Sequence, residues 1–118
     1  MVTVNVAEQP ASPEFTFYDP ANDINEGGSG GDTETSLVVR RPTLLDVQAV
    51  GAAVVLQVQV KVGFDSDFKL FTTLDGSVDD EFLVEFLQPY NFLRIVRTAG
   101  AADPVAKAQF GNVGHGAL

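Results

Sequence analysis

The residue best suited to acid–base chemistry in this 118-residue chain is His115, its only histidine. It stands three residues from the C-terminus, between Gly114 and Gly116. A catalytic base must be held by packing within hydrogen-bond reach of its nucleophile, and a terminal segment rich in glycine does not supply that support. We interpret His115 as a solvated terminal residue, so a Ser-His-Asp triad has no base.

The densest groups of carboxylates are Asp65-Ser-Asp67 and Asp79-Asp80-Glu81. An EF-hand calcium loop that began at Asp65 would need Gly at its sixth position and Glu at its twelfth, where Leu70 and Gly76 stand. Solvated loop carboxylates are the favoured interpretation. A glycosidase pair of carboxylates stays open, because nothing in the sequence selects two of them.

The glycine-rich segment 27–32 superficially suggests a phosphate-binding loop. Such a loop usually ends in Lys-Ser or Lys-Thr before a helix, whereas here Glu26 and Asp32 flank the glycines. Acidic neighbours repel phosphate, and a flexible linker is the favoured interpretation. From these residues we predict no catalytic site, no metal and no cofactor.

Composition excludes further classes of protein. The chain has no cysteine, which rules out zinc ribbons, iron–sulfur carriers and thiol enzymes. It has 16 acidic residues against 7 Lys and Arg, for a net charge of −9. Binding to a nucleic-acid backbone requires clustered Lys and Arg, so we predict no nucleic-acid partner.

Aromatic and arginine side chains are the candidates for an interface. The predicted interface residues are Phe15, Phe17, Tyr18, Arg40, Arg41, Arg94, Arg97 and Phe110. Arginine is favoured in interfaces for its planar donors, although these arginines have the alternative of neutralising acids on their own sheet. The aromatic residues near position 17 either cover one end of their own domain or dock on a neighbouring subunit.

The elements that position these residues are predicted to be β-strands throughout. Aliphatic residues at the even positions of 54–62 alternate with Gln57, Gln59 and Lys61, so this segment has one apolar and one polar face. Residues 45–49 alternate in the same way, and Gly51 between the two segments predicts a hairpin. Segments 68–74 and 81–87 flank an Asp-Gly turn signal and are also predicted to pair.

Four shorter segments complete the predicted strands. Residues 91–98 direct Leu93 and Ile95 to one face, segments 15–18 and 36–41 are short enough to be edge strands, and 105–110 is the last strand. Apolar spacing typical of a long helix is absent. The fold class is therefore all-β: an antiparallel β-sandwich, with a small β-barrel as the alternative.

Charge and composition predict one domain with two appendages. Residues 1–34 hold seven acids and no base, and form an acidic N-terminal arm with a mobile Gly-rich loop. Residues 35–100 are the β-sandwich body, and 101–118 hold the last strand and a C-terminal tail. We expect removal of residues 1–18 to leave the β domain folded but to abolish attachment or oligomerisation.

Neither a secretory signal nor a membrane span is recognisable. The N-terminus lacks a basic start before an apolar stretch. The run from Ala49 to Leu56 is far short of the ~20 apolar residues that cross a bilayer. We predict no membrane partner.

The stretch from Leu44 to Thr98 resembles a family of small β-sandwich structural proteins of tailed bacteriophages. In that family a hydrophobic hairpin is followed by a region approximating Leu-x-Gly-Ser and then by Pro-Tyr-x-Phe/Tyr-Leu/Ile-Arg. The matching pieces here are 54–59, 68–77 and Pro89-Tyr-Asn-Phe-Leu-Arg-Ile-Val-Arg-Thr. The family commonly has a Trp or a Ser-Asn-Asp-Gly turn in the middle hairpin, where this chain has Phe68 or Phe71 and Gly63-Phe-Asp-Ser-Asp.

The resemblance implies a capsid decoration, or cement, protein without enzymatic activity. Such a protein lies on the outer surface of the phage head in the virion and stabilises contacts between major capsid protein subunits. It implies a homotrimer, with a dimer as the alternative. A second hypothesis is a ligand- or carbohydrate-binding sandwich of a phage fibre or baseplate, but sugar sites usually stack on exposed rings and the chain has no Trp and two Tyr.

Overall fold

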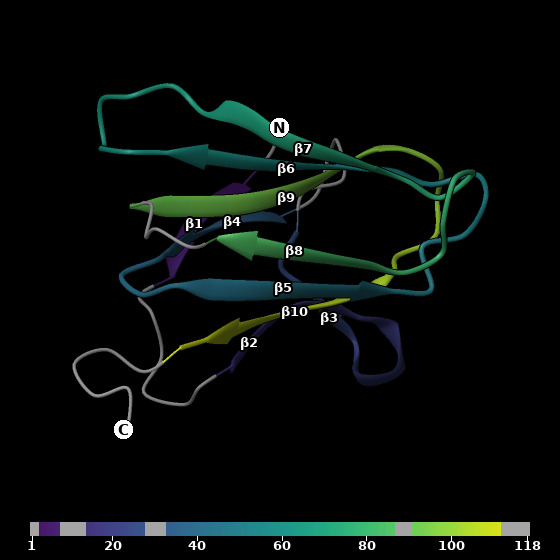
Figure 1. The fold of residues 1–118 in the computed structure, drawn as a ribbon. Helices are drawn as coiled ribbons and strands as arrows, with labels where there is room; N and C mark the ends of the chain where they lie inside the picture. Colours follow the sequence, from purple (N-terminus) through teal and green to yellow (C-terminus); the bar gives the residue numbers. More distant parts are fainter. Residues whose placement is uncertain (1–2, 8–13, 28–32, 87–90, 112–118) are drawn as a thin grey trace.

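The computed structural model describes residues 3–7, 14–27, 33–86 and 91–111, which form two five-stranded sheets (Figure 1). The first sheet has the order β1 (Thr3–Ala7), β4 (Thr33–Val38), β9 (Phe92–Ala99), β6 (Val55–Lys61), β7 (Lys69–Asp75). The second has the order β3 (Ile24–Asn25), β2 (Glu14–Asp19), β10 (Val105–Phe110), β5 (Thr43–Gln48), β8 (Phe82–Phe86). A 3₁₀ turn, η1 (Pro20–Asn22), joins β2 to β3. The β1–β4 pair is parallel and the other pairs are antiparallel.

The all-β prediction is confirmed, and the architecture is the sandwich rather than the barrel. The two sheets share no ladder of hydrogen bonds and do not close on each other. They are joined by the side chains of their inner faces, which supply a single apolar core. This is the ordinary way for two half-apolar sheets to leave water.

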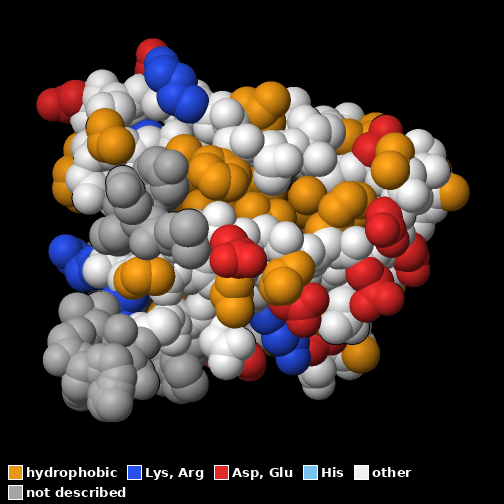
Figure 2. Space-filling model, viewed as in Figure 1, with side chains coloured by type: hydrophobic (Ala, Val, Ile, Leu, Met, Phe, Trp, Pro, Cys, Tyr) orange, Lys and Arg blue, Asp and Glu red, His pale blue; other side chains and the backbone are white. Residues whose placement is uncertain are grey.

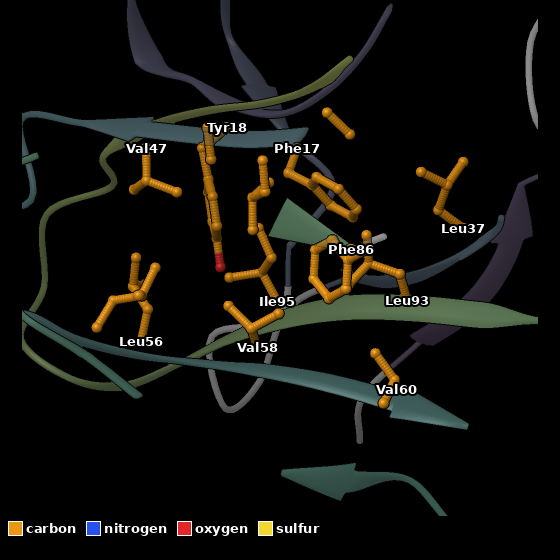
Figure 3. Close-up of a cluster of buried hydrophobic side chains, with 14 of the residues drawn as sticks. Phe17, Tyr18, Leu37, Val47, Leu56, Val58, Val60, Phe86, Leu93 and Ile95 are labelled. Atoms are coloured by element: carbon orange, nitrogen blue, oxygen red, sulfur yellow. The ribbon is translucent and has the colours of Figure 1, made fainter. Parts of the chain in front are cut away.

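Strand β6 shows how the sequence pattern builds the core. Leu56, Val58 and Val60 are buried, while the residues between them are partly exposed. Figure 3 shows Leu56 and Val58 pointing toward Val47 and Tyr18 of the opposite sheet. The predicted face is therefore confirmed from 54 to 60, but Val62 lies beyond the end of the strand and is 64% exposed.

Both predicted hairpins are wrong. Strands β5 and β6 lie in opposite sheets, and so do β7 and β8; instead β5 pairs with β8 and β6 pairs with β7. Ala49 and Gly51 have positive φ angles of 56° and 85°, and the turn that they form carries the chain from one layer to the other. Alternation specifies which face of a strand is buried but does not specify its neighbour, so each layer is completed by a strand from further along the chain.

The predicted edge strands are interior strands. Residues 15–18 belong to β2, which lies between β3 and β10, and residues 36–38 belong to β4, which lies between β1 and β9. Two short segments supply the outer neighbours: 3–7, which was predicted to belong to the N-terminal arm, and 24–25, which was predicted to belong to its mobile loop. The last strand is confirmed as β10, which pairs with both β2 and β5.

The described residues of the acidic segment 1–34 belong to both sheets. Phe17 and Tyr18 of β2 have no exposed surface, and their place is the protein's own core. The part of the predicted mobile loop that is described forms η1 and β3, and the backbone of Glu26 bridges the sheets by bonds to Phe17 and Thr35 of 2.7 and 2.8 Å. Residues 28–32 lie outside the described residues. Because removing residues 1–18 would take Phe17 and Tyr18 from the core, we now expect that deletion to unfold the domain.

Substitution of Leu56 by Ala tests the assignment of the core. Leu56 is fully buried, and removing its side chain should lower the free energy of unfolding by about 2–5 kcal/mol. Val62→Ala, at a position 64% exposed, should change it by less than about 0.5 kcal/mol. Urea unfolding followed by circular dichroism measures both, and equal effects of the two substitutions would contradict the assignment.

Gly76 is the point where the turn after β7 meets the turn before β6. Its amide donates to the carbonyl of Val54 at 2.9 Å, and a Cβ at this position would overlap the backbone oxygen of Gly51. We expect Gly76→Ala to destabilise the fold by about 1–3 kcal/mol, because backbone must move to admit the methyl group. Gly63→Ala is the matched control, since its Cβ would meet Ser66 at an ordinary 3.7 Å. Thermal unfolding that ranked the two variants in the opposite order would contradict this account.

Candidate functional site

Cationic and aromatic side chains gather on the outer surface of the first sheet. The Arg94 guanidinium on β9 lies 3.8 Å from the centre of the Phe68 ring, and its Nε donates to Oε1 of Gln59 on the neighbouring strand at 2.7 Å. Lys61 Nζ lies 4.9 Å from the Phe68 ring and 5.0 Å from that of Phe92. The loop between β6 and β7, residues 62–68, is therefore held against the sheet by cation–π contacts.

Phe64 completes this group. Its ring meets Phe92 edge to face at 4.9 Å, yet 78% of Phe64 remains exposed. We define the aromatic–cation corner as Lys61, Phe64, Phe68, Phe92 and Arg94. A hollow of about 440 Å³ lies beside it, with Asp65 and Asp67 also in its wall. The Phe68 ring already has Arg94 and Lys61 against it, so the exposed apolar surface that this corner offers is mainly that of Phe64.

Of the other predicted interface arginines, Arg97 and Arg41 have partners within the protein, and Arg40 borders this corner. Arg97 forms an ion pair with Asp103, and its Nε donates to the Gly100 carbonyl at 3.1 Å. The Arg41 guanidinium lies 5.5 Å from the centre of the Phe110 ring, at the start of β5. Arg40 is exposed and lines a small hollow with Phe64 and Phe92. For Arg97 the structure therefore has the second of the two predicted roles, in which the arginine neutralises an acid of its own domain.

Most of the predicted aromatic interface residues are not available to a partner. Phe17 and Tyr18 have no exposed surface and Phe110 is 5% exposed. Phe15 is half-buried against Phe17, with ring centres 5.0 Å apart. Of the two alternatives weighed for the aromatic residues near position 17, the structure has the one in which they cover their own core. His115 lies outside the described residues.

Two acidic side chains, Asp75 and Asp80, accept hydrogen bonds within the turns of the fold. Asp75 Oδ1 accepts bonds from the Ser77 hydroxyl and amide at 2.7 and 2.9 Å, and Asp80 Oδ1 accepts one from the Gly51 amide at 2.9 Å. The Ser77 hydroxyl and then the Ser77 amide lower the pKa of the Asp75 carboxyl below its ordinary value. Within the described ranges, no group of three or more potential ligands is placed to hold a metal ion.

Exposed large apolar side chains concentrate on one side of the sandwich. They are Leu44, Val62, Phe64, Leu70, Phe71, Val78 and Leu83. Apart from Leu44, on the strand next to β8, they belong to β7, β8 and the loops 62–68 and 76–81, and we call this set of elements the open side. Figure 2 shows apolar side chains in a row along it, with acidic residues at one end. Exposed apolar surface gathered in one region is typical of a binding surface.

Sequence reasoning missed the open side, although one signal for it was present. The strand Phe82-Leu-Val-Glu-Phe is apolar on both faces, which a strand with one solvated face is not. Leu83 therefore had no place in the core once Phe82, Val84 and Phe86 filled the inner face.

Comparison of the chain with protein-family models, with curated proteins and with solved structures finds no match. Among the described residues there is no helix with the length and apolar character of a membrane span. Fold and surface together define a β-sandwich with an apolar open side.

The hydrogen bonds of Asp75 make a prediction for its titration. Ser77→Ala removes the hydroxyl donor, so the pKa of Asp75 should rise toward its ordinary value while the amide bond keeps it somewhat low. A depressed folded-state pKa stabilises the protein above the unfolded-state pKa, and this contribution is lost as the pH falls through the folded-state pKa. NMR titration of the Asp75 side chain in both proteins measures the change, and an unchanged or lower pKa in the variant would contradict it.

Proposed function

We propose that this protein is a non-enzymatic structural component of a tailed-phage virion, which binds the outer surface of the head as a decoration protein. The observation that supports this proposal is the open side, where six large apolar side chains remain exposed on two edge strands and their loops. A surface of this kind suits adhesion to another protein, because burying it removes apolar area from water. The family resemblance of segment 44–98 supplies the identity of the partner, the major capsid protein.

The aromatic–cation corner, which adjoins the open side through loop 62–68, is the surface best suited to contact the capsid. Phe64 projects from a loop that Lys61 and Arg94 hold against the sheet, so its position is set before binding. A pre-positioned aromatic side chain loses little freedom on docking and is the kind of residue that dominates binding energy in interfaces. Val62, in the same loop, adds a second exposed apolar side chain.

Binding to phage heads tests the proposal. The purified protein should cosediment with expanded heads and bind less to unexpanded ones, since a decoration protein recognises the mature lattice. Phe64→Ser should weaken binding by at least tenfold, because it removes a central apolar contact. Gln48→Ala, an exposed substitution on β5, is the matched control and should bind as the unaltered protein does.

The outcomes of the binding experiment separate the two hypotheses. Failure to bind expanded heads would overturn the proposal. A glycan array run with the same protein tests the carbohydrate-binding alternative, which predicts binding to a glycan. Equal effects of Phe64→Ser and Gln48→Ala would remove the corner from the interface while leaving head binding itself intact.

A further inference from the structure

Strand β8 lies at the edge of the second sheet. Among the described residues it pairs with one strand, β5, through five residues in unbroken register. Edge strands usually avoid further pairing through a bulge, a lysine, a proline or a very short length. β7 begins with Lys69 and has a register shift opposite Val58 and Gln59, and β3 has two residues. β8 has no bulge, no lysine and no proline and is five residues long, so the exposed Glu85 is its one charged side chain.

The side chains around β8 leave apolar surface for a further strand to cover. Leu83 on its outer face is 65% exposed, while Phe82 and Val84 on its inner face are partly exposed. Above the strand, the Phe71 ring of β7 lies 4.6 Å from Phe86 and is still 37% exposed. A strand added beside β8 would gain backbone hydrogen bonds and also cover this seam between the sheets.

We propose that β8 pairs antiparallel with β8 of a second copy of this chain, about a two-fold axis at Val84. The second sheet of one copy then continues into the second sheet of the other copy across the interface. This pairing is self-complementary, as a two-fold interface requires. It also places inner-face residues opposite inner-face residues, with Phe82 facing the second copy's Phe86.

Charge selects this register over its neighbours. With Val84 opposite Val84, each Glu85 faces the second copy's Leu83. A shift of two residues one way places Glu85 opposite Glu81, and a shift the other way places Glu85 opposite Glu85. Like charges directly opposite each other destabilise a pair of strands. Of these three registers, only the one centred on Val84 avoids them.

The ends of the strand are complementary as well. Asp79, Asp80 and Glu81 precede β8 at one end, while Arg40 and Arg41 lie at the other end, next to Thr43, which pairs with Phe86. The two-fold axis brings the acidic end of each copy level with the arginine end of the other. Asp80 then lies across from Arg41 at about two strand spacings, or ~10 Å, which exceeds the screening length of ~8 Å at physiological salt, so the attraction between them is weak and grows only as the salt is lowered.

A single cysteine tests the geometry, because the chain has none of its own. Val84→Cys places two thiols across the axis with Cα atoms about 4.5–5.5 Å apart, which allows a disulfide. Leu83→Cys is the matched control, since its two copies are diagonal neighbours about 7–8 Å apart, beyond disulfide reach. Under mild oxidation we expect a covalent dimer from Val84→Cys on denaturing electrophoresis. An equal yield from both variants, or none from either, overturns the proposal.

Sedimentation equilibrium with charge variants tests it without relying on Val84. The unaltered protein should show twice its 12.6 kDa mass, with a concentration-dependent dissociation. Leu83→Glu creates two Glu–Glu pairs and should raise the dissociation constant roughly tenfold, whereas Leu83→Lys creates two Lys–Glu pairs and should lower it. Val62→Glu and Val62→Lys, equally exposed in the 62–68 loop, should change it little.

A protein that is monomeric at every concentration overturns the proposal. An oligomer that responds alike to Glu and Lys at position 83 also overturns it. These results do not depend on binding to phage heads, so the dimer and the proposed function fail separately. Val62 and Phe64 lie in the loop 62–68 and not on β8. Pairing of β8 therefore leaves the aromatic–cation corner available to another partner.

Discussion

The contact between the inner faces of the two sheets is the interaction on which the rest of the structure depends. Neither sheet shares a hydrogen bond ladder with the other, so the layers are joined by apolar side chains such as Leu56, Tyr18 and Ile95. Where the chain crosses from one sheet to the other, as between β5 and β6 and between β7 and β8, it places apolar side chains on both sides of this contact. The turns at Gly51 and Gly76 each carry the chain from one sheet to the other. They approach each other so closely that a side chain on Gly76 has no room.

The sequence specified faces well and neighbours poorly. Strict alternation along β6 and the paired Leu93 and Ile95 of β9 predicted which side chains enter the core, because burial on one face imposes a period of two. The pairing of strands was mispredicted, since an Asp-Gly signal at 75–76 marks a turn but not whether the chain stays in its sheet. Segment 24–25 carries no pattern of its own, and its place beside β2 follows from backbone bonds that composition does not encode.

The candidate site was predictable only in part. Arg94 was singled out for its type and scarcity, but its cation–π contact with Phe68 depends on the path of loop 62–68 across the sheet, which local sequence does not determine. Phe17 and Tyr18 were weighed equally as core and interface because a short aromatic segment in an acidic region fits both. The open side arises from which strands end each sheet, and strand order is a property of the whole chain.

The position of β10 between β2 and β5 has a consequence for synthesis of the protein. Most of the chain lies between β2, which ends at Asp19, and β10, which begins at Val105, and Lys107 of β10 lies opposite both Thr16 of β2 and Asp46 of β5. On the ribosome, β2 emerges before β10 and has to wait for it before its buried aromatic residues can be enclosed. Such long-range pairing is slow to form. A nascent chain of this protein therefore cannot pair β2 with β10 until Val105–Phe110 has been translated, and its second sheet is completed only after that point.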